Sequence, residues 1–360
     1  MKTINAMQLK ALIKNKAREI GVAPQLVLQN YMMERLLERM SKSEHADKFI
    51  IKGGFLLSSV VGLSSRATMD LDATIKGVSL THENLQKIMV DICNVQIDDD
   101  VSFELLRITD IRETDDYPGL RAFLEANYPP MKVPLTIDVT TGDVITPKEI
   151  AFSFQSMFDE TKILMLAYTV ETVLAEKIET ILVRGIANTR PRDYYDVFII
   201  SKTKSNEIDY AVLKDALAAT CKKRNSEYVI TDYKKIIEMI FDSWNDDNNY
   251  KLNLKPRCYI EKPKITLVET GENSQYMVGV KTRKLNQTRG NKMGNDAFIR
   301  DDVQMNDVVN VICKTITEEC DDPSFINFFK SMEYNNSNDD NGNNNTNNYY
   351  NRRYYNNSNN

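Results

Sequence analysis

The chain has 360 residues, of which 42% are hydrophobic and 27% charged, an ordinary globular composition with enough length for two domains. Its net charge of −5 provides no overall positive field, so any contact with nucleic acid must come from a local basic patch. Five scattered cysteines without a C-x-x-C pair argue against a disulfide framework and a zinc site. With no apolar run long enough for a signal peptide or a membrane span, we expect a cytoplasmic protein without a membrane partner.

Only two histidines are present, His45 and His82, and neither has a sequence neighbour that suggests a metal ligand or a base. This scarcity argues against most Ser–His, Cys–His and His–metal mechanisms.

The chain is predicted to begin with two helices, over residues 5–20 and 24–41. Apolar residues recur there at helical spacing, and Gly21 and Pro24 mark the break between them. We expect the pair to pack as a cap on the sheet that follows.

Residues 49–72 are the most informative segment, because they predict a strand, a turn at Gly53 and Gly54, a short helix and a second strand that ends in Asp70 and Asp72. Side chains two residues apart on a strand share one face at roughly 7 Å, so the two carboxylates can hold one hard cation. The Gly-Gly start of a helix presents backbone N–H groups to an anion such as a phosphate. A divalent metal beside a phosphate indicates nucleotide chemistry.

A helix is expected over residues 82–94, followed by short strands over 101–111 and 133–143. Asp138 lies between two apolar residues of the last strand and projects to the opposite face. If that strand lies beside the one carrying Asp70 and Asp72, Asp138 is a third carboxylate of a magnesium site. Otherwise Asp138 is a solvent-facing strand residue.

Helical patterns begin near residue 169, and Lys177 and Arg184 fall on nearly the same side of the first helix. The next helix carries Asp193 and Asp196 one turn apart. Taken alone, Lys177 can be a surface lysine lying along its helix, and the two aspartates can stabilise a helix N-terminus.

Helices continue over residues 207–245, where the basic cluster 222–224 suits either RNA phosphates or a solvated helix end. The stretch 250–300 is polar and strand-like in places. Apolar residues recur again at helical spacing over 306–319 and predict a helix there. Residues 335–360 are about half Asn and are expected to be disordered.

The order of KGGFLLSS, RATMDLD, LTIDVTTGD, ETVLAEKIETILVRG and RPRDYYDVFII resembles the DNA polymerase beta superfamily of nucleotidyltransferases. It resembles more closely the abortive-infection AbiE-type toxins (AbiEii) of type IV toxin–antitoxin systems, over residues 50–200. The resemblance implies an α+β fold: a nucleotidyltransferase domain (mixed sheet with helices) over 1–160, capped by the N-terminal helices, and a mainly helical domain over 161–330 that completes the cleft. Residues 250–300 are atypical of the family, and 335–360 form a tail.

The resemblance also implies the site residues. The metal ligands are Asp70, Asp72 and Asp138, and the catalytic set adds Lys177 and Asp193. The nucleotide-binding residues are Gly53, Gly54, Arg66, Thr68, Lys177, Arg184 and Asp196.

The activity implied by the resemblance is metal-dependent transfer of a nucleotide from a nucleoside triphosphate (NTP), with Mg²⁺ or Mn²⁺, to the 3′ end of transfer RNA (tRNA), with release of pyrophosphate. The implied partner is a cognate antitoxin that acts as a transcriptional repressor, and the implied role is growth arrest in phage defence. Three alternatives remain at this point: nucleotidylation of a protein hydroxyl, a catalytically inactive RNA- or antitoxin-binding module, and a kinase-like phosphotransferase.

Overall fold

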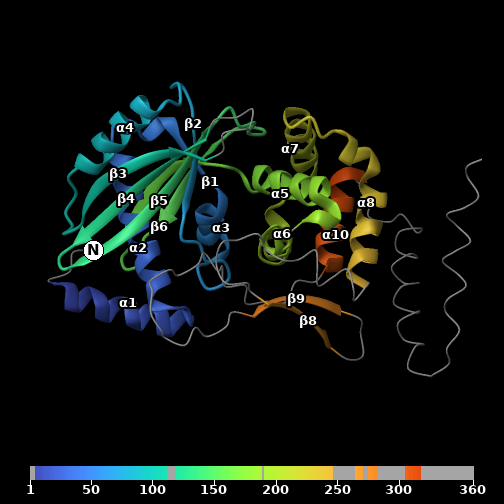
Figure 1. Ribbon diagram of the computed structural model, residues 1–360, viewed down its shortest axis with the longest axis horizontal. Helices are drawn as coiled ribbons and strands as arrows, with labels where there is room; N and C mark the ends of the chain where they lie inside the picture. The colour runs from blue at the N-terminus through green and yellow to red at the C-terminus, as the bar shows by residue number, and fades with distance from the viewer. Residues whose placement is uncertain are drawn as a thin grey trace, which may run out of the picture.

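The computed structural model describes residues 5–111, 119–188, 190–245, 264–270, 275–281 and 305–317. A sheet with its covering helices forms one part of the molecule, and a group of helices from the second half of the chain lies beside it (Figure 1). None of the described helices has the length and apolar character needed to cross a membrane.

The described residues form a mixed seven-stranded sheet in the order β3-β4-β5-β2-β1-β7-β6. Its parallel pairs are β2 with β5 and β1 with β7, and the other neighbours are antiparallel. The strands are β1 (Phe49–Lys52), β2 (Leu71–Ile75), β3 (Ser102–Asp110), β4 (Gly119–Tyr128), β5 (Met131–Thr141), β6 (Ile150–Gln155) and β7 (Lys162–Ala167). This mixed α+β architecture is the fold class expected from the sequence.

Strand alternation separates an apolar face of the sheet from a polar one. In β5, Ile137 and Val139 are fully buried, whereas Asp138 between them is partly exposed. In β2, Leu71 and Ala73 are likewise buried on either side of the partly exposed Asp72. Because successive strand residues point to opposite faces, the two aspartates lie on the face away from this core.

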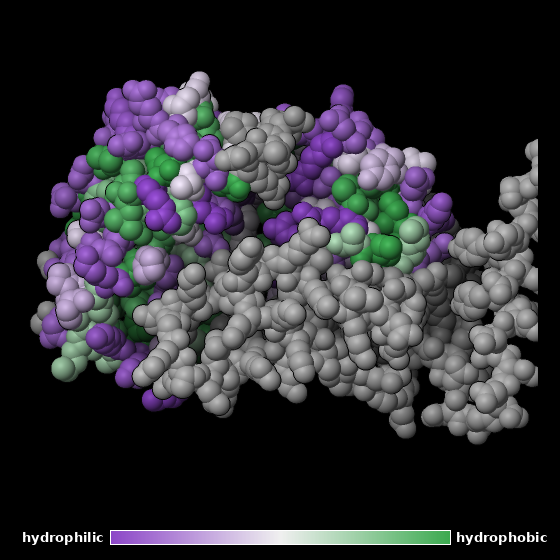
Figure 2. Space-filling model, in the orientation of Figure 1, coloured by the Kyte–Doolittle hydropathy of each residue, from purple (hydrophilic) through white to green (hydrophobic). Residues whose placement is uncertain are grey.

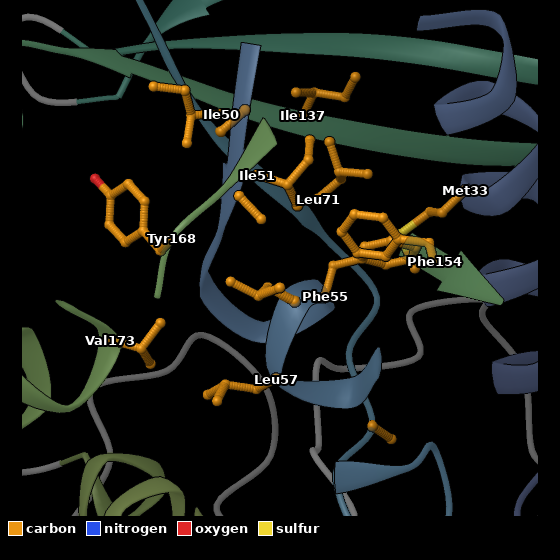
Figure 3. Packing of buried hydrophobic residues seen from close by; sticks show 14 of the residues in the cluster. Met33, Ile50, Ile51, Phe55, Leu57, Leu71, Ile137, Phe154, Tyr168 and Val173 are labelled. Carbon is orange, nitrogen blue, oxygen red and sulfur yellow. The ribbon is translucent and has the colours of Figure 1, made fainter. Parts of the chain in front are cut away.

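The N-terminal helices cover the sheet as expected. Helix α2 packs against β5 and β7, α1 packs against α2, and α4 packs against β3. Figure 3 shows part of the core, where Phe55 of α3 stacks on Phe154 of β6; the ring centroids are 5.8 Å apart. The elements of this part are α1 (Ala6–Ile20), α2 (Pro24–Lys42), η1 (Ala46–Lys48), α3 (Gly53–Val61) and α4 (His82–Asn94).

The helical part is built around α5, which packs against α6, α7 and α8. Thr169 caps α5 by accepting a hydrogen bond from the Thr172 backbone at 3.2 Å, and the helix ends at its C-cap residue Gly185. The elements are α5 (Val170–Arg184), η2 (Gly185–Ala187), α6 (Pro191–Thr203), η3 (Ser205–Glu207), α7 (Tyr210–Lys223), α8 (Tyr228–Asn245) and α10 (Met305–Thr317).

The structure corrects two expectations about the strands. The strand predicted to end at Asp72 instead runs from Leu71 to Ile75, so Asp70 precedes it, because pairing with β5 begins at Leu71. Strands β4, β6 and β7 were not predicted, and β7 extends the sheet to Ala167.

The described residues include only part of the C-terminal segments whose structure the sequence predicts. Within 250–300, β8 (Lys264–Thr270) and β9 (Gln275–Lys281) pair in an antiparallel manner. The helix expected over 306–319 is α10. The rest of 250–300 and the tail 335–360 lie outside the described residues.

Candidate functional site

Helix α3 begins at the expected Gly-Gly pair, directly beside Asp72. Gly53 has φ +64°, and a Cβ atom there would lie 2.1 Å from Asp72 Oδ2. The Gly54 backbone N–H donates to the same oxygen at 3.3 Å. Gly53 is therefore required both for its backbone conformation and for the close approach of the carboxylate. This arrangement places the N-terminus of α3 against the carboxylate.

Gly53→Ala should lower the nucleotide-transfer activity that the family resemblance implies by tenfold or more. The added methyl group must displace Asp72, and displacements of about 1 Å at a reacting centre cost on the order of 10²-fold. Gly77→Ala is the matched control, since Gly77 has φ +71° and no atom within 4 Å of the added Cβ. Both variants should lose roughly 1 kcal/mol of stability from the positive φ. Steady-state kinetics and urea unfolding of both variants test this, and equal activity losses would contradict it.

Asp72 and Asp138 lie on the sheet face away from the core, and Asp70 lies just before the strand that carries Asp72. Asp72 and Asp138 are directly opposite each other in the parallel register of β2 and β5. Burial, followed by the charges of Asp138 and Asp70, raises the pKa of Asp72 above its ordinary value. Asp70 accepts a hydrogen bond from Thr136 Oγ1 at 2.6 Å. The acids thus repel one another, which a cation between them would relieve.

Asp138 is held by a cation of the protein itself. Arg121 lies opposite Asp138 in the antiparallel register of β4 and β5. Its Nε and Nη2 atoms donate to the two carboxylate oxygens, each at 2.6 Å. The carboxylate predicted as the third metal ligand is therefore engaged on both oxygens.

The donor chemistry of the three acids fits a hard divalent cation, because all three offer carboxylate oxygens. Their side chains are not gathered as tightly as a complete ligand set, however. Within the described part of the chain, the acidic or histidine group whose ligand atoms all lie within 4.8 Å of one another is Glu44, His45 and Asp91, not the three acids.

His45 directly precedes η1 and is a buried histidine with partners on both ring nitrogens. It is 5% exposed, its Nε2 lies 2.9 Å from Asp91 Oδ2, and its Nδ1 lies 2.8 Å from Lys48 Nζ. Since a lysine ammonium can only donate, Nδ1 accepts and Nε2 carries the proton toward Asp91. Both ring nitrogens are thus used in a hydrogen-bonded network that joins η1 to α4.

A second charged cluster lies in the helical part. Lys177 Nζ contacts Asp193 Oδ1 at 2.8 Å and Asp196 Oδ2 at 3.0 Å. Asp196 also accepts from Arg66 Nε at 2.6 Å. The Arg66 and Lys177 cations hold the pKa of Asp196 below its usual range against the opposing effect of burial. Asp193 is therefore an ion-pair partner of Lys177, and Asp196 is an ion-pair partner of both Lys177 and Arg66.

Arg66 and Thr68 connect the two clusters. A Cβ atom on Gly54 would lie 2.8 Å from Thr68 Oγ1 and 3.6 Å from Arg66 Nη2, which places both side chains against the start of α3. The Arg66 side chain is only 5% exposed, and its guanidinium is bound to Asp196. Arg66 thus ties the start of α3 to α6. Arg184 lies half-buried in the last turn of α5, seven residues beyond Lys177.

Lys52 and Asp143 form a further pair at the edge of this site. Lys52 lies opposite Asp72 in the register of β1 and β2, but its Nζ donates to Asp143 Oδ2 at 2.5 Å and to Thr140 Oγ1 at 2.7 Å. Burial opposes the ionisation of Asp143, and the Lys52 charge and hydrogen bond outweigh it, so the pKa of Asp143 is lowered. The pair fixes the end of β5 against β1.

Asp143→Asn should cost about 1.5–3 kcal/mol at pH 7, the usual range for a hydrogen bond to a charged group. Because the folded-state pKa of Asp143 is lowered, this stabilisation is complete above the unfolded value near 4 and is lost as the pH falls through the folded pKa. The difference between the wild type and the variant in urea unfolding should therefore shrink from pH 7 to pH 3. A difference independent of pH would contradict it.

The sequence prediction missed Arg121, Thr136 and Asp143, all of which touch predicted site residues or their neighbours. The available signal for Arg121 was the alternation of apolar residues at 120, 122, 124 and 126 with polar residues at 121, 125 and 127. Figure 2 shows hydrophilic residues on both sides of the junction between the sheet and the helical part.

Comparison with known proteins identifies the family. A model of the family described as the nucleotidyl transferase AbiEii toxin of type IV toxin–antitoxin systems matches residues 35–268, which are 234 of the 360 residues. Two solved structures are similar over 64% of this chain at 15% identity. One is a candidate nucleotidyltransferase from H. pylori, covered over 88% with a TM-score of 0.38, and the other is JHP933 from Helicobacter pylori, covered over 85% with a TM-score of 0.37. A comparison with curated proteins gives no match. Since the family model covers well over half of its length, the chain belongs to the AbiEii family of nucleotidyltransferase toxins.

Proposed function

We propose that the protein transfers a nucleotide from an NTP to the 3′ end of tRNA and releases pyrophosphate. The observation that carries this proposal is the junction at the start of α3, where Gly54, Asp72 and the Arg66–Asp196–Lys177 cluster meet. A helix N-terminus, carboxylates and cations are the groups that a metal-bound triphosphate requires. Membership of the AbiEii family supports the same reaction class.

Asp70, Asp72 and Asp138 would hold Mg²⁺ or Mn²⁺, since their oxygen donors and mutual repulsion suit a hard cation. The bound cation would neutralise charge that develops on the phosphates. Asp138 also engages Arg121 on both oxygens, so a bound cation would have to share these oxygens with the guanidinium or displace it. The N-terminus of α3 would face the phosphates, with Gly54 and Thr68 beside it.

In the reaction, the 3′ oxygen of the acceptor forms a bond to the α-phosphorus as the bond from that phosphorus to the bridging oxygen of pyrophosphate breaks. The proton of the 3′ hydroxyl passes to a carboxylate oxygen, for which Asp138 is the proposed acceptor. Lys177 would neutralise the triphosphate from the helical side, and Asp193 would orient Lys177, to which it is bonded at 2.8 Å. Arg184 would assist from the last turn of α5. No histidine is needed for this chemistry.

The proposal includes two domains, with the sheet and its helices up to the end of β7 as one and the helical part as the other. As a member of a toxin–antitoxin family, the chain is expected to have an antitoxin partner. We further propose that this antitoxin is a transcriptional repressor, that the toxin acts in the cytoplasm, and that it arrests growth during phage infection.

Mass spectrometry of total tRNA after incubation with the full chain, all four NTPs and Mg²⁺ tests the reaction. Asp72→Asn serves as the inactive control. The expected result is tRNA extended at its 3′ end by one or more nucleotides with the wild type alone. A parallel reaction with labelled NTPs and separated RNA and protein fractions distinguishes the alternatives: label in protein alone indicates a protein acceptor, transfer of phosphate without a nucleoside indicates a kinase, and no transfer indicates a binding module.

A further inference from the structure

We infer that Arg121 is an internal counter-ion that competes with a divalent cation for Asp138 and thereby sets the metal concentration at which the site is filled. This inference rests on the proposed function, because it takes the three acids to be the metal ligands. Neither the expected site residues nor the family match assigns a role to Arg121.

The hydrogen-bond geometry is the first support. Arg121 donates to both oxygens of Asp138 at 2.6 Å in a bidentate pair, the strongest arrangement available to an arginine and a carboxylate. A cation approaching Asp138 must then share these oxygens with the guanidinium and is also repelled by its charge. Arg121 and a metal therefore oppose each other at Asp138.

The sheet register is the second support. Arg121, Asp138, Asp72 and Lys52 lie opposite one another in a row across β4, β5, β2 and β1. The row places one cation at each end and two carboxylates in the middle. Lys52 turns away to Asp143 and Thr140, whereas Arg121 turns toward its neighbouring carboxylate. The register thus holds Arg121 beside Asp138.

Exposure is the third support, because it distinguishes a displaceable cation from a fixed one. The Arg121 side chain is 40% exposed, compared with 5% for Arg66 in its pair with Asp196. Released Arg121 can be solvated by water, whereas Arg66 would be left as a buried, unpaired charge. Arg121 can therefore leave its carboxylate at a lower cost than Arg66 can, as a competing counter-ion must.

Titration of the purified full chain with Mn²⁺ alone, followed by electron paramagnetic resonance of the free ion, tests the inference without an NTP. Arg121→Gln should bind Mn²⁺ about tenfold more tightly than the wild type, because a charge that repels the metal across a few ångströms has been removed. Arg121→Lys keeps the charge but loses the bidentate geometry, and should lie between the two. Half-maximal transfer should correspondingly need less Mg²⁺ in Arg121→Gln.

Arg107→Gln is the matched control. Arg107 lies on β3 opposite Phe123 of β4, and its guanidinium lies 3.9 Å from the ring centroid instead of on a carboxylate. Its replacement makes the same change in net charge and should alter the Mn²⁺ affinity less than twofold.

Three results would each overturn the inference. The wild type and both Arg121 variants could bind Mn²⁺ with equal affinity, Arg121→Gln could bind it more weakly than the wild type, or no variant could bind it. Arg121→Lys keeps the test informative if Arg121→Gln does not fold. Failure of the proposed tRNA reaction is a separate outcome. Tighter binding in Arg121→Gln that is abolished by Asp72→Asn would support the counter-ion even if tRNA were not the acceptor.

Discussion

Asp72→Asn should lower the rate of nucleotide transfer by 10²- to 10³-fold or more, while the protein stays folded. Losses of about this size follow removal of one preorganised electrostatic group, and here the group is also a proposed metal ligand. The raised pKa of Asp72 shows that its ionised form is disfavoured in the folded protein. Removing that charge should therefore leave the thermal midpoint unchanged or raise it.

The measurement combines transfer kinetics at saturating NTP with thermal unfolding of the same preparations. Asp91→Asn is a suitable control, because Asp91 is a carboxylate outside the site that contacts His45. It should retain full activity. An active Asp72→Asn variant would rule out Asp72 as a metal-binding catalytic residue, and an inactive variant with a much lower midpoint would indicate a structural role instead.

Asp196→Ala should destabilise the protein by about 3–5 kcal/mol, the usual cost of removing one partner from a buried ion pair. The Asp196 side chain is fully buried and bonded to Arg66 and Lys177. Its loss would leave Arg66 without its carboxylate in a site that is 5% exposed. Urea unfolding at pH 7 measures the change.

The exposed Lys204–Glu207 pair provides the comparison, because it has similar geometry at 2.8 Å with side chains that are 26% and 60% exposed. Glu207→Ala should cost less than about 1 kcal/mol. If Asp196→Ala were no more destabilising than Glu207→Ala, the buried cluster would not hold the two parts of the chain together.

The sequence was sufficient to predict several helices and the strand face on which Asp138 lies. Strong 3.6-residue periodicity located the α1, α2, α4 and α5 helices closely, and the apolar neighbours of Asp138 predicted which face it occupies. Its place beside Asp72 is confirmed by the parallel register of β2 and β5. Local signals were sufficient here because each depends on neighbours in the chain.

Strand β4 shows why other parts escaped prediction. Its sequence GLRAFLEANY is rich in Leu, Ala, Arg and Glu, which favour helices, and strand formation is imposed by pairing with β3 and β5 on both sides. Arg121 was missed with its strand. The pairing of Asp196 with Arg66 was equally inaccessible, because it joins residues 130 positions apart.

The loop between α3 and β2 is held from the helical part at two points. Tyr195 donates to the Ser65 carbonyl at 2.6 Å, and Asp196 accepts from Arg66. Asp70 follows Arg66 by four residues, so the segment that leads to Asp70 and Asp72 is anchored on α6. The position of the carboxylates therefore depends on both parts of the molecule, because a shift of α6 would be transmitted through Ser65 and Arg66 to the segment that carries Asp70 and Asp72.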